Sequence, residues 1–205
     1  MKIGIMGGTF NPIHNGHLSL ADAALKQYHL DEIWFMPSGL PAHKANDELL
    51  SSEKRFLMVQ LAIKDTDKFK ASSFEIDRAG YTYTADTMVA LAKEYPKAEF
   101  YYIIGGDSLM KFHKWVKPEV ISAHTSLLAA GRNGYSKEEL ILQAENLKQQ
   151  FGTKVFFLEM PELVISSNEI RSLCKVNHYE AINTMVPETV FRYITENELW
   201  KCPMN

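Results

Sequence analysis

Residues Gly7 to His17 read GGTFNPIHNGH, a stretch that places two glycines and two histidines in the turn after the first predicted strand. That strand runs from Lys2 to Met6. An amphipathic helix follows, and its apolar face carries Leu18, Ala21, Leu25 and Tyr28. A glycine-rich turn that opens into a helix presents backbone N–H groups and the positive end of the helix dipole. The stretch therefore predicts a phosphate-binding site.

His14 and His17 lie three residues apart at the start of this helix. An imidazole N–H can donate a hydrogen bond to phosphoryl oxygens as negative charge develops on them, which favours chemistry on a phosphate over storage of one. The role of His43 stays open. The other histidines are interpreted as surface or packing residues, namely His29, His113, His124 and His178.

The composition excludes several classes of protein. The chain has 205 residues, 46% of them hydrophobic and 23% charged, which is enough for one ordinary core. The 22 basic and 25 acidic residues give a formal charge of −3, which argues against nucleic-acid or membrane partners. Cys174 and Cys202 show neither a pairing pattern nor metal-ligand spacing, so a reducing, cytoplasmic location is expected.

Short apolar runs alternate with helical patterns along the chain. Further strands are predicted at Glu32–Pro37, within Phe69–Ile76, and at Phe100–Ile104, Ser126–Ala130 and Val155–Leu158. Helices are predicted around Arg55–Ile63, Met88–Tyr95 and Ser136–Phe151, then near Ser167 and after Pro187. This alternation predicts an α/β fold with a Rossmann-like, doubly wound parallel sheet in a single domain, 1–205, whose helical C-terminal part begins at about residue 166.

In an open α/β sheet the ligand lies beyond the carboxyl ends of the strands, so the loops after strands one, two, four and six are expected to converge. They bring Lys44, Asp107 and the segment ISSNEIR, which carries Ser166, Ser167 and Arg171. These side chains suit phosphate and ribose chemistry. Two structural alternatives remain: Asp107 as the N-cap of a short helix toward Phe112, and Ser166 with Glu169 as a capping box.

The chain resembles the HxGH nucleotidyltransferases, and among them the bacterial nicotinate-nucleotide adenylyltransferases. The similarity spans nearly the whole chain through GGTFNPIHNGH, PAHK at 41–44, YTYTADT at 81–87, IGGDS at 104–108, KW at 114–115 and ISSNEIR at 165–171. Asn168 stands where the family usually has threonine.

The resemblance implies that the phosphate of nicotinate mononucleotide attacks the α-phosphorus of ATP, giving deamido-NAD and pyrophosphate without a covalent enzyme intermediate. It assigns catalysis to His14, His17, Lys44 and Arg171. It assigns ATP binding to Gly7, Gly8, Thr9, Phe10, His14, His17, Gly105, Asp107, Ser166, Ser167, Asn168 and Arg171. It assigns mononucleotide binding to Asn11, Lys44, Thr84 and Trp115, with the pyridine ring on the indole and the carboxylate at backbone donors near Thr84. Mg²⁺ is expected to be held mainly by nucleotide phosphates and water, with no metal site of the protein's own.

Other functions remain open at this stage. The acceptor could instead be nicotinamide mononucleotide or phosphopantetheine, and a passive dinucleotide-binding module is the non-enzymatic alternative. No GxGxxG follows the first strand, and the two histidines have no role in such a module. Trp115 has a purely structural alternative, in which it is a packed core aromatic residue. The sequence leaves open whether the chain forms a homo-oligomer.

Overall fold

The computed structural model describes residues 1–40, 48–78, 80–131, 134–161 and 165–201. Six parallel strands form one sheet in the order β3-β2-β1-β4-β5-β6. Their bounds are β1 Lys2–Gly8, β2 Glu32–Pro37, β3 Phe69–Ala71, β4 Glu99–Ile104, β5 Ser126–Ala130 and β6 Val155–Leu158. The strand order reverses between β1 and β4, and a crevice at such a point is where α/β sheets bind ligands.

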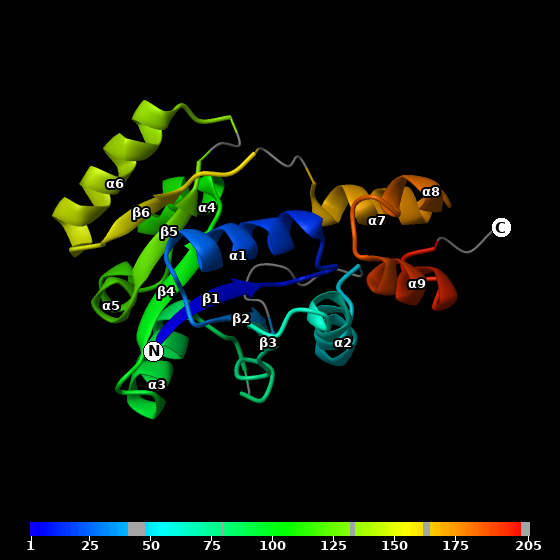
Figure 1. The fold of residues 1–205 in the computed structure, drawn as a ribbon, viewed down its shortest axis with the longest axis horizontal. Coiled ribbons are helices and arrows are strands. Elements are labelled where there is room, and N and C mark those ends of the chain that lie inside the picture. Colours follow the sequence, from blue (N-terminus) through cyan, green and yellow to red (C-terminus); the bar gives the residue numbers. More distant parts are fainter. Residues whose placement is uncertain (41–47, 79, 132–133, 162–164, 202–205) are drawn as a thin grey trace.

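Helices cover both faces of the sheet (Figure 1). On one face lie α1 (Asn15–Gln27) and α2 (Ser52–Ile63), and the buried residues of α7 (Ser167–Lys175), α8 (Tyr179–Ile182) and α9 (Glu188–Glu196) join the same apolar cluster. On the other lie α3 (Thr84–Glu94), α4 (Gly106–Lys111), the short 3₁₀ helix η1 (Phe112–Lys114), α5 (Pro118–His124) and α6 (Lys137–Phe151). The predicted α/β class and Rossmann-like parallel sheet are confirmed.

Two apolar layers result, because alternate side chains of a strand point to opposite faces. In β1, Ile3 and Ile5 pack with the layer that includes α3 and α6, whereas Met6 packs with the layer under α1 and α2. Gly4 faces this second layer, and a Cβ atom there would lie 2.5 Å from Ile33 Cδ1. The sheet is therefore buried on both faces, as a parallel sheet requires.

Several elements differ from the sequence predictions in length or number. β1 continues two residues past the predicted end, through Gly8, since its last residues pair with Met36 and Pro37 of β2. β3 occupies only Phe69–Ala71 of the longer range expected. The helices α5 and α8 were not predicted, because each has only one or two turns and no extended apolar period. The capping box between Ser136 and Glu139 is present.

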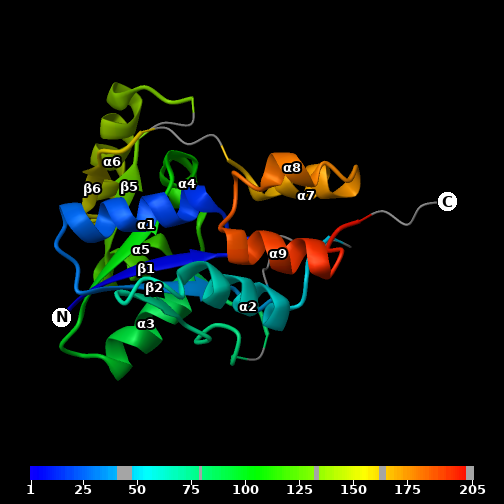
Figure 2. The same ribbon diagram turned by 45° about the vertical axis from the view of Figure 1, so that its right-hand side comes forward.

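The C-terminal helices lie beyond the carboxyl end of β1, beside the start of α1 (Figures 1 and 2). Two hydrogen bonds fix this arrangement: Asn15 N–H donates to Met185 O at 2.8 Å, and Asn15 Nδ2 donates to Thr184 O at 3.0 Å. The segment after α8 thus meets the turn that carries both histidines. In the described part of the chain, every helix is too short or too polar to span a membrane.

Candidate active site

The turn after β1 folds back on itself at Phe10. This residue has a φ of 48°, in the left-handed region that side chains larger than glycine rarely adopt. Its buried ring contacts the rings of Phe35 and His17, with the His17 centroid 5.1 Å away. Such strain persists only where packing determines the conformation, and it is common at functional sites. The aromatic contacts therefore hold the turn beside the start of α1.

His14 is the N-cap of α1 and His17 is the third residue of the helix. The backbone N–H of His14 donates to Nδ1 of His17 at 3.3 Å. Because this bond uses Nδ1 as an acceptor, a neutral His17 carries its proton on Nε2 and can donate from there. Burial lowers the pKa of His14 to about 4, so this imidazole is neutral at physiological pH. Its Nδ1 atom is buried and has no hydrogen-bond partner among the described residues.

Two cavities meet at this turn. The larger has a volume of about 760 Å³ and lies between the turn, α4 and the start of α7. The smaller has a volume of about 430 Å³ and lies between β1, β4 and the start of α3. The residues that line both are Gly8, Thr9, His17, Leu20 and Gly105. His17 is therefore the described titratable residue that faces both spaces.

The start of α7 forms one wall of the larger cavity. Ser166 is its N-cap and accepts a hydrogen bond from Glu169 N–H at 3.1 Å, which is one half of the expected capping box; the described structure gives no return bond from Ser166 N–H to the Glu169 carboxylate. The hydroxyl of Ser167 donates to Pro12 O at 2.8 Å, which ties α7 to the turn after β1. Both serines also line the cavity. The cap and the cavity wall are thus built from the same residues.

Arg171 is held on three sides at the edge of this cavity. Its Nε lies 2.9 Å from a Glu48 carboxylate oxygen, Nη1 donates to Asn11 O at 3.0 Å, and Nη2 donates to Asn168 Oδ1 at 3.1 Å. Glu48 also forms an ion pair with Lys175, and the hydrogen bonds from Lys175 and Arg171 lower the pKa of its carboxyl. The asparagine in place of the usual threonine therefore accepts a hydrogen bond from Arg171.

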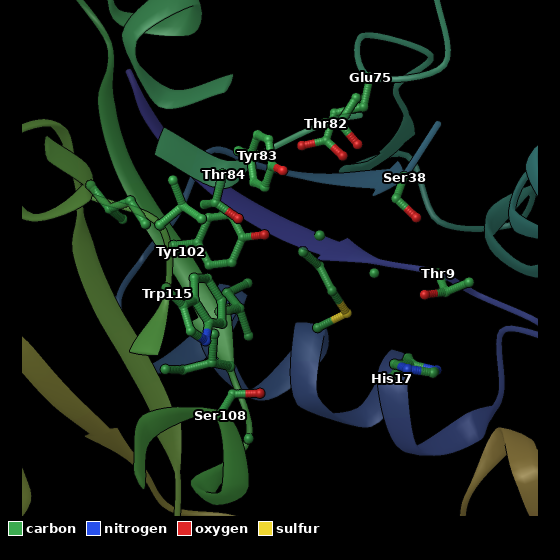
Figure 3. Close-up of a pocket in the computed structure, with 18 of the residues that line it drawn as sticks. Thr9, His17, Ser38, Glu75, Thr82, Tyr83, Thr84, Tyr102, Ser108 and Trp115 are labelled. Atoms are coloured by element: carbon green, nitrogen blue, oxygen red, sulfur yellow. The ribbon is translucent and has the colours of Figure 1, made fainter. Parts of the chain in front are cut away.

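The smaller cavity has an aromatic end. The Trp115 ring lies against Tyr102 with centroids 5.9 Å apart and an interplanar angle of 85°, and it also packs on Phe112. Figure 3 shows Trp115, Tyr102 and Thr84 toward one side of the space, and Thr9 and His17 toward the other. A Cβ atom on Gly7 would lie 2.1 Å from the Tyr102 hydroxyl oxygen, so only glycine leaves room for that side chain. Trp115 is both packed and part of the cavity wall.

Polar groups line the same cavity near the end of β2. Glu75 is buried and accepts a hydrogen bond from Thr87 Oγ1 at 2.7 Å, and burial raises the pKa of its carboxyl. Burial and the neighbouring Glu75 also raise the pKa of Tyr102. The hydroxyl of Ser38 is buried without a partner in the described structure. These groups can hydrogen-bond to a polar ligand.

Arg55 of α2 supports the walls of both cavities from behind. Its side chain is 1% exposed and donates to Leu50 O, Thr9 O, Ser38 O and Gly39 O at 2.7 to 3.1 Å. One guanidinium therefore joins the turn after β1 to the end of β2. Arg55 was not among the predicted site residues, although it precedes the buried Val59 by four residues and so lies on the same helix face.

The structure gathers most of the predicted site residues. All those expected to bind ATP, except Gly7, line the larger cavity, and Gly7 lines the smaller one with Thr84 and Trp115. Asn11 lines the larger cavity, where its side chain hydrogen-bonds to Glu48 O and Leu50 N. Lys44 and His43 lie outside the described residues, as does Cys202.

The structural alternative for Asp107 is also decided. Asp107 is not an N-cap: Gly105 is the N-cap of α4, because the helix begins one residue before Asp107, which lies in its first turn. The histidines interpreted as surface or packing residues are exposed, namely His29, His113, His124 and His178. Glu48, Glu75 and Tyr102 were missed, since their contacts join segments far apart in the sequence.

Comparisons with known proteins identify the family of the chain. Residues 5–173 match the cytidylyltransferase-like family. A probable nicotinate-nucleotide adenylyltransferase of Lachnoclostridium phytofermentans is 44% identical over 96% of this chain and 97% of its own length. One of Clostridium tetani is 36% identical over 98% of this chain and 99% of its own.

Solved structures share the fold. The nicotinic acid mononucleotide adenylyltransferase of Plasmodium falciparum, complexed with NaAD, is 22% identical and superposes with a TM-score of 0.81 over 97% of each chain. The same Plasmodium enzyme complexed with APC gives a TM-score of 0.79 over 97% of this chain and 96% of its own. With its sheet, its histidine turn and these relatives considered together, the chain belongs to the nicotinate-nucleotide adenylyltransferases of the cytidylyltransferase-like family.

Proposed function

We propose that this protein transfers the adenylyl group of ATP to nicotinate mononucleotide, forming deamido-NAD and pyrophosphate in NAD biosynthesis. The observation that carries the proposal is the meeting of two nucleotide-sized cavities at His17 and the turn after β1. A transfer between two nucleotides needs both phosphates at one point, and this geometry provides it. The names of the relatives support the same substrates.

The larger cavity is proposed to bind ATP. Its wall includes the starts of α1, α4 and α7, whose dipoles favour anions. Arg171 lies at its edge with its guanidinium oriented by Glu48, Asn11 and Asn168, so it is placed to stabilise the phosphates that leave as pyrophosphate. Gly105 and Asp107 would contact the adenosine end.

The smaller cavity is proposed to bind the acceptor, with its pyridine ring on Trp115 and its phosphate toward Thr9 and His17. In Figure 3 these two groups of residues lie toward opposite sides of the space, which suits a mononucleotide lying along it. Thr84 begins α3, so backbone N–H groups at that helix start would receive the carboxylate. Lys44 is proposed to contact the acceptor phosphate, and Asn11, which lines the larger cavity, to contact that phosphate from the ATP side.

In the reaction, an oxygen of the acceptor phosphate attacks the α-phosphorus of ATP, and the bond between the α-phosphorus and the bridging oxygen to the β-phosphorus breaks. The electron pair leaves with pyrophosphate, and no bond to the protein forms. His17 Nε2 would donate to the α-phosphoryl oxygens as their charge increases, and the neutral His14 stacks on it. Catalysis then rests on positioning and charge stabilisation.

Mg²⁺ fits this site as a partner of the nucleotide. Asp107 is the one carboxylate among the described residues that line the larger cavity, and no cluster of three potential ligands occurs in the described part of the chain. The donor set therefore suits an ion held by phosphate oxygens and water, with Asp107 within the same cavity. When bound, Mg²⁺ would neutralise charge on the triphosphate.

The test is a panel of acceptors with ATP and Mg²⁺, in which pyrophosphate release is measured and the product is identified by mass spectrometry. We expect release that depends on nicotinate mononucleotide, with formation of deamido-NAD. A preference for nicotinamide mononucleotide or phosphopantetheine would overturn the proposed acceptor. No release with any acceptor would indicate a binding module. The cytoplasmic location stays a prediction.

A further inference from the structure

Lys114 is the one lysine or arginine among the described residues that line the smaller cavity. It is the last residue of η1 and directly precedes Trp115. Its side chain is exposed and forms no ion pair or hydrogen bond within the described structure. Lys114 thus contributes to the cavity wall, and no described protein group holds its side chain elsewhere.

The other titratable groups described in the cavity wall form no ion pair or hydrogen bond with Lys114. Glu75, the one carboxyl among the described lining residues, is buried against Thr87, and burial raises the pKa of that carboxyl. His17 lies toward the side opposite Trp115 (Figure 3). The cavity wall thus includes, directly beside Trp115 in the chain, a lysine that no described anion of the protein neutralises.

This position matters because the two ends of the acceptor carry different charges. The phosphate belongs near His17 and Thr9, where transfer takes place, so the group that reaches the Trp115 end is the substituent of the pyridine ring. An acid and an amide have nearly the same shape there, and their main difference is one negative charge. A cation at that end distinguishes them by charge.

We propose that Lys114 is a specificity-determining residue that favours an aromatic carboxylate over the corresponding amide in the smaller cavity. The inference rests on the proposed function, because it presumes that the acceptor's ring lies against Trp115. It adds a side-chain charge to the backbone N–H groups near Thr84. Since the lysine is exposed, its contribution should weaken as salt increases.

The experiment compares wild type, Lys114→Gln, Lys114→Arg and Lys111→Gln. Lys111 is the matched control, since it is an exposed lysine of α4 that lines neither cavity. For each protein, KM and kcat are measured with nicotinate and nicotinamide mononucleotide at low and high salt. We expect Lys114→Gln to raise the KM for the acid about tenfold and to leave the KM values for the amide and ATP within about twofold.

Lys114→Arg should retain most of the preference for the acid, and Lys111→Gln should match wild type. The acid-to-amide ratio of kcat/KM should fall with salt in wild type and change little in Lys114→Gln. An unchanged ratio in Lys114→Gln, or equal losses for acid and amide, would overturn the inference. If wild type itself transfers no adenylyl group to either acceptor, the proposed function fails instead, so the two failures are distinguishable.

Discussion

The rings of His14 and His17 stack with their centroids 3.7 Å apart and an interplanar angle of 30°. Two cationic imidazoles would repel each other at this distance. Burial keeps His14 neutral, so this repulsion does not arise. His14 therefore serves as an uncharged support whose backbone N–H fixes the acceptor nitrogen of His17. The pair gives one oriented N–H donor at the meeting point of the two cavities.

Replacing His17 by alanine should lower kcat by about 10²-fold or more, the effect of losing a fixed donor to a developing charge. The fold should persist, because His17 is only half-buried. Steady-state pyrophosphate release measures the loss, and circular dichroism checks the fold. His113→Ala, at an exposed position, is the control and should retain wild-type turnover. A His17→Ala enzyme with normal kcat would contradict the assigned role.

Stability should depend on pH through His14. Its pKa is about 4 when folded and near 6.5 when unfolded, so the unfolded chain binds more protons between these values. The stabilising contribution is fully present above pH 6.5 and is lost as the pH falls to about 4, a change of about 3 kcal/mol. Urea unfolding of wild type and His14→Asn from pH 4 to 8 measures it, since asparagine does not titrate and is a favoured N-cap residue. Identical pH slopes in the two proteins would contradict this prediction.

Arg171→Lys should raise the KM for ATP about tenfold, because lysine keeps the charge and loses the fork that bonds to Glu48, Asn11 and Asn168. The KM for the acceptor should change little, since Arg171 lines only the larger cavity. The matched control is Arg192→Lys, at an exposed position of α9. Equal changes in the KM of both substrates would show that Arg171 does not act on ATP alone.

Arg55→Met should lower the free energy of unfolding by about 3 kcal/mol, because it leaves buried carbonyls without donors. Arg55→Lys should lose less, since an ammonium group satisfies some of them. Urea denaturation gives the values, and Lys54→Met at an exposed position of α2 is the control. If Arg55→Met unfolded at the wild-type urea midpoint, the hydrogen bonds from Arg55 to Thr9 O and Ser38 O would contribute nothing to the free energy of unfolding.

Removal of divalent metal should abolish turnover, and Mg²⁺ should restore it at concentrations that follow its affinity for ATP. The described donor set gives the protein no cage of its own, so calorimetry without nucleotide should show no tight Mg²⁺ binding. Micromolar binding to the nucleotide-free protein would contradict a nucleotide-held ion.

The sequence predicted the parts that depend on short stretches of chain. The alternation of apolar strands and amphipathic helices determines a parallel sheet covered on both faces, and residues 7–17 determine a helix that starts at the histidine pair. Gly7 lies in this stretch, but the requirement for glycine there comes from another strand, because the residue leaves room for the Tyr102 hydroxyl. Short helices such as α5 were not predicted, because a helix of two turns has too few residues to show the apolar periodicity of a helix.

Only the tertiary structure decided how these parts meet. Glu48 and Arg171 are 123 residues apart in the chain, and Arg55 reaches carbonyls of two separate loops. Such contacts follow from the direction and reach of side chains after the helices have packed on the sheet, and no local pattern encodes them. The same holds for the division of the site into two cavities and for the position of Lys114 beside one of them. The amino-acid sequence determines which chemical groups are present, and the packing of helices on the sheet determines which of them face each other.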